Sequence, residues 1–343
     1  MTASALPETM RVCVLREAGR LELADWPVPR PGPGEVLVAV RSVGVCGSDV
    51  HYFRDGRIGD FVVRRPLVLG HEASGQIAAV GAGVDAGRVG ARVAIEPGAA
   101  CGMCGECKAG RYNLCPDMRF FATPPVDGAL AQYVVVRADL AFDLPEAVSD
   151  DDAALLEPLS VGIWATGKAG ITVGSSVLIA GAGPIGLVAA QVARSRGAAT
   201  IAVTDIAPKR LAAARRHGAT LALDARDGPA AGIQFDAFLD CSGAPSAITA
   251  GIWALRPAGR AVLVGMGPDE VTLPLARLQQ RELTVTGTFR YANTWPAAIA
   301  LAASGSVDLS GLVTDRFGLA EAEQALRSTT EAGTIKSIIE PWR

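Results

Sequence analysis

Four cysteines lie within one short segment of the chain, at Cys101, Cys104, Cys107 and Cys115. Their spacing in a glycine-rich stretch lets a short loop wrap one tetrahedral Zn²⁺ and fill every coordination position with thiolates. Four unrelated reduced thiols are the alternative, but the segment contains little apolar material that could bury them. A nucleic-acid zinc module is disfavoured because the loop has few cations and the chain is acidic overall. We therefore predict a structural zinc site in a lobe covering about residues 98–117.

A second set of ligand types is spread more widely in the sequence. Cys46 lies in VGVCGSDVHYF, and His71 and Glu72 lie in LVLGHEASG, both in glycine-flanked turns after apolar runs. A thiolate, an imidazole and a carboxylate can hold Zn²⁺ and leave the fourth position open, as a catalytic zinc requires. Taken alone, such a cysteine is more often a small buried hydrophobic residue and such a histidine is more often a hydrogen-bonded turn residue, so the residues by themselves leave the zinc site open.

A third pattern indicates a dinucleotide. Gly181, Gly183 and Gly186 follow the apolar run SVLIA and open the helical run GLVAAQVARSRG. Such glycines allow a tight turn, a close backbone approach to a pyrophosphate and close strand–helix packing. Asp205 ends the next strand, where its carboxylate can accept hydrogen bonds from both ribose hydroxyls and repel a 2′-phosphate, which favours NAD over NADP. Arg210 lies near enough to weaken the preference for NAD. The alternative interpretation of the whole pattern is a glycine-rich turn with a capping aspartate and no dinucleotide.

Two further places could take part in chemistry. Glu157 lies in the apolar run AALLEPLSVGIWA, where a buried carboxylate is costly unless a positive group such as a nearby zinc compensates it. A solvated carboxylate at a helix start is the alternative. Arg290 and Tyr291 follow the strand TVTGTF and could hold a polyhydroxylated substrate, although a salt-bridged strand end is the commoner case.

The elements that must position these residues change character along the chain. Up to about residue 150, short apolar runs separated by glycine and proline predict a β-rich domain. From about Val161, strand-sized runs alternate with alanine-rich helical runs, which predicts βαβ units and a parallel sheet. The tail predicts helices at Trp295–Ala303 and 320–329 and a closing strand in TIKSIIEPW. A length of 343 residues agrees with two domains rather than one.

Composition excludes several classes of function. Half of the residues are hydrophobic and the formal net charge is -3, so the chain is folded and has no basic field for nucleic acid or an anionic membrane. The uncharged stretch 169–193 is long enough to span a bilayer, but its glycines and Pro184 indicate a strand, a turn and a helix instead. The first fifteen residues show no export signal, so we expect a cytoplasmic protein with reduced thiols and a small-molecule partner.

Together these motifs resemble the zinc-dependent medium-chain dehydrogenase/reductase superfamily. Its signature G-H-E-x2-G-x5-G-x2-V is matched by Gly70, His71, Glu72, Gly75, Gly81 and Val84. The resemblance covers essentially the whole chain. It implies an α/β protein with a GroES-like β-barrel catalytic domain at 1–158, an inserted NAD-binding Rossmann domain with a doubly wound parallel sheet at 159–289, and a return to the catalytic domain at 290–343.

Within the superfamily the chain resembles the sorbitol and xylitol dehydrogenases, through CGSDVHYF at 46–53, LLEPLSVG at 155–162 and TFRYANTWP at 288–296. Glutamate at 157, where ordinary alcohol dehydrogenases have a cysteine ligand, implies a catalytic zinc held by Cys46, His71, Glu72 and water. The resemblance places Ser48 and His51 near the cofactor ribose and the proton path. It assigns polyol binding to Tyr52, Glu157, Arg290 and Tyr291. The expected NAD contacts are Gly181, Gly183, Pro184, Ile185, Gly186, Asp205, Arg210, Val264, Gly265, Met266, Thr288, Phe289 and Arg290.

The resemblance implies oxidation of a polyol by NAD⁺ to a ketose and NADH, with two Zn²⁺ per chain and a homotetramer or dimer. The proton leaves through Glu157 or through Ser48 and His51, and the sequence leaves both routes open. Animal sorbitol enzymes lack the complete cysteine set, so the chain looks more like microbial relatives and the substrate cannot be copied from the animal enzymes. A dehydrogenase of another secondary alcohol, diol or sugar acid is the same-class rival. A redox-inactive protein that binds NAD and zinc is the rival from another class.

Overall fold

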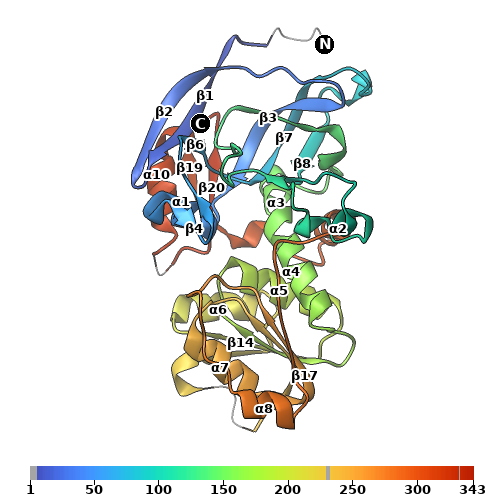
Figure 1. Ribbon diagram of the computed structural model, residues 1–343, viewed down its shortest axis with the longest axis vertical. Helices are drawn as coiled ribbons and strands as arrows, with labels where there is room; N and C mark the ends of the chain where they lie inside the picture. Colours follow the sequence, from blue (N-terminus) through green and yellow to red (C-terminus); the bar gives the residue numbers. More distant parts are fainter. Residues whose placement is uncertain (1–5, 229–231, 332) are drawn as a thin grey trace. The chain divides into compact units, whose positions relative to one another are not determined.

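The computed structural model describes residues 6–228, 232–331 and 333–343 and divides into two compact units (Figure 1). The first, which we call the split unit, consists of Met1–Glu157 and Leu309–Arg343, and the second, the inserted unit, is Pro158–Asp308. Helix α4 (Leu156–Lys168) contains the first boundary between them.

The split unit is built mainly from β-strands. Its largest sheet has seven strands in the order β12-β8-β7-β3-β20-β19, with β11 pairing β3. A three-stranded sheet has the order β2-β1-β6, and the pairs β4-β5 and β9-β10 complete the unit. The strands are β1 (Thr9–Glu17), β2 (Arg20–Pro27), β3 (Glu35–Gly44), β4 (Arg57–Ile58), β5 (Phe61–Val62), β6 (Leu67–Val68), β7 (Glu72–Val80), β8 (Arg92–Ile95), β9 (Gly98–Ala99), β10 (Arg119–Phe120), β11 (Tyr133–Arg137), β12 (Ala141–Asp143), β19 (Val313–Gly318) and β20 (Lys336–Glu340).

The short apolar runs of the sequence form these strands because valine, isoleucine and leucine pack well on a pleated, half-buried surface. In β3 the run Val36, Leu37 and Val38 is completely buried and belongs to one core shared with β1, β7 and β11. The helices of the split unit are α1 (Gly47–Asp55), α2 (Gly105–Lys108), α3 (Asp150–Ala154) and α10 (Ala322–Ser328). This β-rich architecture confirms the predicted class of the first domain.

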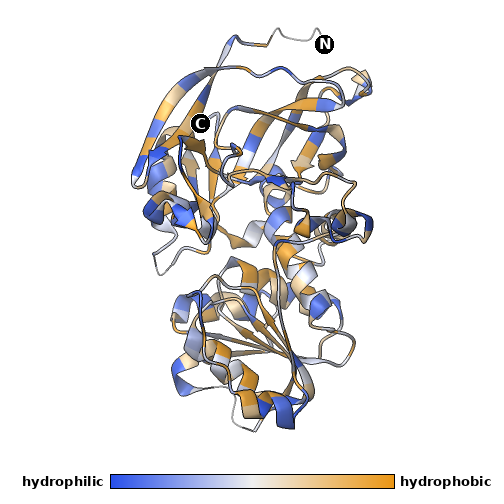
Figure 2. Ribbon diagram, in the orientation of Figure 1, coloured by the Kyte–Doolittle hydropathy of each residue, from blue (hydrophilic) through white to orange (hydrophobic). Residues whose placement is uncertain are grey.

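The inserted unit contains a six-stranded parallel sheet in the order β15-β14-β13-β16-β17-β18. This doubly wound order confirms the predicted Rossmann fold. Its strands are coloured mainly hydrophobic in Figure 2, as expected for strands buried on both faces. They are β13 (Ser176–Ala180), β14 (Thr200–Asp205), β15 (Leu221–Asp224), β16 (Phe235–Asp240), β17 (Leu255–Leu263) and β18 (Thr284–Gly287). The helices are α4, α5 (Pro184–Ser195), α6 (Pro208–Arg216), α7 (Pro245–Trp253), α8 (Leu275–Gln280) and α9 (Trp295–Ala303).

The second domain boundary differs from the predicted one. The sequence predicts a return to the catalytic domain at residue 290, whereas the inserted unit extends to Asp308. The reason is a set of contacts with α5: Gln191 donates to the carbonyl of Asp308 at 3.2 Å and accepts from its N–H at 2.6 Å. Residues 290–308, including α9, therefore belong with the Rossmann sheet.

The stretch 169–193 contains strand β13, a glycine turn and most of α5, which agrees with the strand, turn and helix read from its glycines. Across the described residues, none of the helices combines the length and the apolar character that crossing a bilayer demands.

Candidate active site and metal centres

Cys46, His71 and Glu72 converge in the split unit, and one ligand atom from each lies within 4.8 Å of the others. His71 and Glu72 are buried and Cys46 is half-buried. Sulfur, imidazole nitrogen and carboxylate oxygen at this separation fit one Zn²⁺, with a coordination position left for a substrate oxygen. The donor set therefore fits a catalytic zinc.

Backbone geometry brings the three residues together. Cys46 is the residue immediately before helix α1, and His71 and Glu72 lie at the start of β7. Strands β3 and β7 pair so that Gly44 lies opposite Glu72. A Cβ atom at Gly44 would lie 2.0 Å from Glu72 Oε2, so only glycine leaves room there for the carboxylate.

Behind the ligands lies Asp49, a buried carboxylate that the sequence analysis did not single out. Asp49 accepts hydrogen bonds from the N–H groups of Cys46 at 3.0 Å and Gly70 at 2.9 Å, and its Oδ1 lies 3.7 Å from His71 Nδ1. Burial opposes ionisation of Asp49, but the attraction of His71 and these hydrogen bonds lower its pKa. An acid three residues after Cys46 was the available signal, and its carboxylate lies on the Nδ1 side of the imidazole, where a neighbour can orient a ligand histidine.

Lys336 is a second buried residue that the sequence analysis missed. Its Nζ donates to Glu72 Oε1 at 2.7 Å and to the carbonyl of Val45 at 2.8 Å. Burial lowers the pKa of Lys336, but the carboxylate of Glu72, with a further contribution from Cys46, raises it above the ordinary value. The sequence places Lys336 264 residues after Glu72, so no local pattern could reveal this pair.

Glu157 is buried, as the apolar run around it indicates. The negative charge of Glu157 helps to raise the pKa of Lys336, so the Lys336 ammonium lies close enough to compensate this carboxylate within the split unit. Glu96, at the end of β8, is a further buried carboxylate and accepts a hydrogen bond from the Tyr112 hydroxyl at 2.8 Å. Burial raises the pKa of Glu96 to about 7, and the charge of Glu157 contributes to that rise.

Three more predicted residues lie on α1. Tyr52 is buried, Ser48 is half-buried, and His51 reaches the surface with 38% of its side chain exposed. His51 Nδ1 lies 3.2 Å from Asp55 Oδ2. Hydrogen bonds from Arg54 and then His51 lower the pKa of Asp55 to about 2, so this carboxylate is ionised at neutral pH. The polar side chains of helix α1 thus lie at positions that range from buried to solvent-exposed.

The four clustered cysteines have ligand atoms within 4.8 Å of one another and are not joined by disulfides. Cys101 Sγ and Cys107 Sγ are 3.9 Å apart. Zn–S bonds of about 2.3 Å at tetrahedral angles would separate two sulfurs by roughly 3.8 Å, so the spacing fits a Zn(Cys)₄ centre. Backbone N–H groups of Cys104 and Cys107 donate to the sulfurs of Cys101 and Cys104, each at 3.4 Å.

The electrostatics of this loop call for a cation. Hydrogen bonds from the backbone of Met103 and Cys104 lower the pKa of Cys101 to about 7. Burial and hydrogen bonding with neighbouring cysteines raise the pKa of Cys107 to about 12. Without a metal the loop therefore favours the thiolate of Cys101 and resists that of Cys107, whereas Zn²⁺ would stabilise both.

In the inserted unit, the glycines of the fingerprint differ in the space around them. Gly181 has φ +96°, and a Cβ at Gly186 would lie 1.9 Å from the carbonyl oxygen of Gly181. A Cβ at Gly183 meets nothing within 4 Å, and Gly183 is the N-cap of α5 with Pro184 and Ile185 in its first turn. Open space beside the unpaired N–H groups of a helix start fits a pyrophosphate.

Asp205, at the end of β14, is held beside this turn. Its Oδ2 accepts from the N–H of Ala182 at 2.8 Å, and its Oδ1 accepts from that of Ala207 at 2.9 Å. Each oxygen keeps a second lone pair with which it can accept from a ribose hydroxyl. Arg210 is half-buried in the first turn of α6, four residues beyond the exposed side chain of Ile206.

The other predicted cofactor residues follow strand ends of the same sheet. The N–H groups of Val264 and Gly265 both donate to the carbonyl of Asp240, and the N–H of Thr288 donates to that of Leu263. Asp240 is completely buried and accepts from Ser242, a role that the sequence analysis missed. Met266 and Phe289 are exposed, as expected of residues that follow strand ends.

Arg290 and Tyr291 also belong to the inserted unit, unlike Tyr52 and Glu157. Arg290 has φ 53°, a left-handed conformation that is uncommon for a residue with a Cβ, and its guanidinium lies 4.7 Å from the ring centre of Phe289. Tyr291 is buried beside Trp295. Backbone strain at Arg290 is typical of functional positions.

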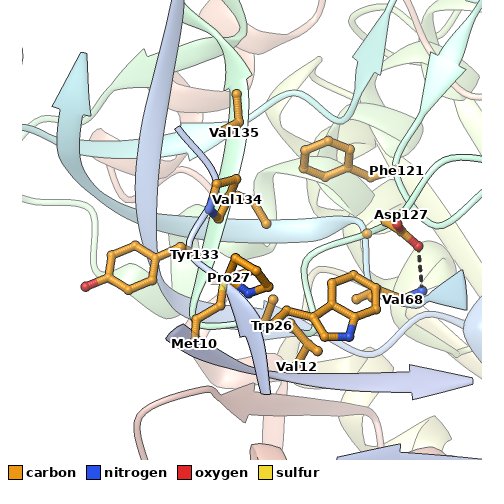
Figure 3. A pocket seen from close by; sticks show the side chains of 13 residues that line it. Met10, Val12, Trp26, Pro27, Val68, Phe121, Asp127, Tyr133, Val134 and Val135 are labelled. Carbon is orange, nitrogen blue, oxygen red and sulfur yellow. Dashed lines mark hydrogen bonds between the residues drawn. The ribbon is translucent and has the colours of Figure 1, made fainter. Parts of the chain in front are cut away.

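A separate pocket of about 260 Å³ in the split unit contains none of the predicted site residues (Figure 3). Its walls are largely apolar and include Trp26 and Phe121. Its carboxylate, Asp127, accepts a hydrogen bond from the N–H of Val68 at 2.9 Å, drawn as a dashed line in Figure 3. Asp127 is the single carboxylate among the described lining residues, so this pocket lacks a set of metal ligands.

Comparison with known proteins agrees with these sites. Residues 32–146 match the model for the alcohol dehydrogenase GroES-like domain, and residues 184–304 match that for zinc-binding dehydrogenases. The chain is 46% identical to sorbitol dehydrogenase of Gallus gallus, covering 95% of both chains, and 43% identical to that of Bacillus subtilis, covering 94% of both. An Escherichia coli alcohol dehydrogenase solved with NADH superposes with a TM-score of 0.91 at 30% identity, covering 97% of this chain and 100% of that one.

These matches extend over nearly the full length of the relatives. The chain belongs to the zinc-dependent medium-chain dehydrogenase/reductase superfamily and, within it, to the sorbitol dehydrogenase or polyol branch. Identities to the bird and bacterial enzymes are nearly equal, so overall identity does not favour microbial relatives over animal ones.

Proposed function

We propose that this protein oxidises a secondary hydroxyl of a polyol of the sorbitol, xylitol or galactitol type with NAD⁺, giving a ketose and NADH. The observation that carries the proposal is the convergence of Cys46, His71 and Glu72 in the same unit as the buried Glu157. Likeness to sorbitol dehydrogenases over about 95% of the chain supports the substrate class.

Cys46, His71 and Glu72 would hold the catalytic zinc, which supplies Lewis-acid stabilisation of the developing negative charge on the substrate oxygen. Within the split unit, Tyr52 and Glu157 would bind the other hydroxyls. Two groups of the chain can take up the hydroxyl proton. Glu157 is one, and the other is the route along α1 from the half-buried Ser48 to the partly exposed His51.

NAD⁺ would supply the hydride acceptor, and the residues of the inserted unit would bind and orient it. The open space at Gly183 and the first turn of α5 would take the pyrophosphate, and Asp205 would accept from the ribose hydroxyls. Because the carboxylate of Asp205 would repel a 2′-phosphate, NAD⁺ should be strongly preferred to NADP⁺.

The test is NAD⁺-dependent absorbance growth with stereochemically distinct polyols, repeated with 2,3-butanediol and L-idonate. Turnover of sorbitol, xylitol or galactitol is the expected result. Activity on butanediol or idonate alone would replace the substrate class with the diol or sugar-acid alternative. An absence of turnover on every substrate, with NADH still bound, would favour a redox-inactive protein.

We further propose two Zn²⁺ per chain and a homotetramer or dimer in the cytoplasm. The seven cysteines are all free, which agrees with a reducing compartment. Strand β18 ends the parallel sheet, and within the described parts of the chain its outer edge pairs with no other strand. An exposed edge of this kind can pair with a second copy, and light scattering coupled to gel filtration would give the number of subunits.

A further inference from the structure

A single buried ammonium connects the two chain segments that carry the three catalytic zinc ligands. Lys336 Nζ lies 2.7 Å from both carboxylate oxygens of Glu72, the neighbour of His71. It also donates to the carbonyl of Val45, the neighbour of Cys46, at 2.8 Å. One side chain therefore contacts the residue next to each of the other two ligands.

The backbone fixes this ammonium in place. Lys336 begins β20, which pairs with β3 so that Ile338 lies opposite Gly44, and the N–H of Val45 donates to the carbonyl of Ser337 at 3.0 Å. The side chain of Lys336 is 3% exposed and that of Glu72 is 1% exposed. The ion pair is thus shielded from water and held by the central sheet of the split unit.

Stability alone is a poor explanation for such a pair. Removing two charges from water costs about as much as their attraction returns, so packed apolar residues would stabilise the fold equally well. The pair has a clear use if the carboxylate of Glu72 must be held in one position. The hydrogen bonds of Lys336 to Glu72 and to the carbonyl of Val45 would fix this carboxylate relative to the segment that ends in Cys46.

We propose that Lys336 is a positioning residue for the catalytic zinc, which orients the Glu72 carboxylate and holds the Val45–Cys46 segment against it. This inference rests on the catalytic zinc site of the proposed function. Glu72 Oε2 is buried, and apart from the Lys336 ammonium 2.7 Å away it has no hydrogen-bond partner among the described residues, so a lone pair of this oxygen remains available to the metal. Neighbours of this kind that orient first ligands commonly change metal affinity by about 10–100-fold.

The experiment compares zinc binding by the full-length wild type with that of K336M, K336Q and K336R. Zinc per chain is measured by elemental analysis after dialysis, and the affinity of each site by titration with a chromophoric chelator. K168M is the matched control, because Lys168 ends α4 and lies outside every site described above. Absorption of the Co²⁺-substituted proteins reports the ligand geometry without any turnover.

We expect K336M and K336Q to keep the cysteine-loop zinc and to bind the second zinc about 10–100-fold more weakly, with altered Co²⁺ bands. K336R, which keeps the charge, should restore binding to within a few-fold, and K168M should match the wild type. K336Q guards against a folding defect in K336M, since its amide can still donate to Val45.

Two results would overturn the inference. One is a folded K336M or K336Q that binds the second zinc within twofold of the wild type, and the other is a K336R that loses zinc as completely as K336M. A wild type that holds only the cysteine-loop zinc would instead overturn the catalytic zinc of the proposed function itself.

Discussion

At the scale of single residues, the chemistry of this protein depends on charged groups that are buried and paired. Asp49 lies beside His71, and Lys336 lies against Glu72. Glu157 is buried in the same unit. A charge taken out of water must meet an opposite charge, a hydrogen bond or a metal, so each buried group limits what its neighbours can be.

The role of Glu157 can be tested with E157Q, which removes the charge and keeps the shape. We expect kcat on the preferred polyol to fall by about 100-fold or more, because a group that takes up the proton is lost. NADH affinity, followed by fluorescence titration, should change less than twofold. E146Q is the control, because Glu146 lies in an exposed loop. Unchanged kcat in E157Q, together with a large loss of kcat in H51A, would show that the proton leaves by the Ser48–His51 route instead.

Glu96 gives stability a defined dependence on pH. Burial raises its pKa from 4.5 to about 7, so the folded state binds this proton more tightly than the unfolded state. Its contribution is therefore fully present below pH 4.5 and is lost as the pH rises through 7. The glutamine of E96Q still accepts from Tyr112 but does not titrate. The free energy of unfolding of E96Q, relative to that of the wild type, should therefore rise by on the order of 2–3 kcal/mol from pH 5 to pH 8.5. Chemical unfolding at the two pH values measures this gain, and parallel pH profiles for the two proteins would refute it.

At the scale of elements, strand pairing and helix starts decide where the ligand atoms lie. The pairing of β3 with β7 places Glu72 over Gly44, where a side chain would collide with the carboxylate. The glycines in the turn from β13 to α5 have different surroundings. Gly186 is in close contact with the backbone of Gly181, whereas the space beside Gly183 is open.

This difference predicts separate effects for two similar substitutions. G183A should leave the melting temperature within about 2 °C of the wild type and weaken NADH binding about 10-fold or more, because its methyl group would occupy the pyrophosphate space. G186A should weaken binding and also lower the melting temperature by several degrees, because its Cβ would collide with Gly181. Calorimetry and NADH titration distinguish the two, and equal melting temperatures for both variants would contradict this account of the turn.

At the scale of the whole molecule, a β-rich split unit and a parallel-sheet inserted unit are made from one chain that leaves the first and returns to it. The proposed metals belong entirely to the split unit, and the fingerprint glycines belong to the inserted unit. Loss of one site should therefore leave the others able to bind.

C104S tests this independence. We expect one zinc per chain instead of two, a lower melting temperature and unchanged NADH affinity, because only the cysteine loop loses its metal. C13S is a suitable control, because Cys13 is buried and burial raises its pKa to about 12, which makes it a poor metal ligand. Loss of both zincs in C104S would show that the sites are coupled.

The sequence by itself predicted the fold class, the dinucleotide fingerprint and the four-cysteine loop, because periodicity, glycine turns and short spacings are local properties. Cys46, His71 and Glu72 are separated along the chain, and only the resemblance to a family singled them out as one set. The sequence did not determine the end of the inserted unit at Asp308, which depends on hydrogen bonds between Gln191 and a residue 117 positions away. The tertiary structure alone revealed Lys336 beneath Glu72, Asp49 behind His71 and the raised pKa of Glu96. Burial and charge pairing act through space between residues that the chain separates, so no local pattern in the sequence encodes them.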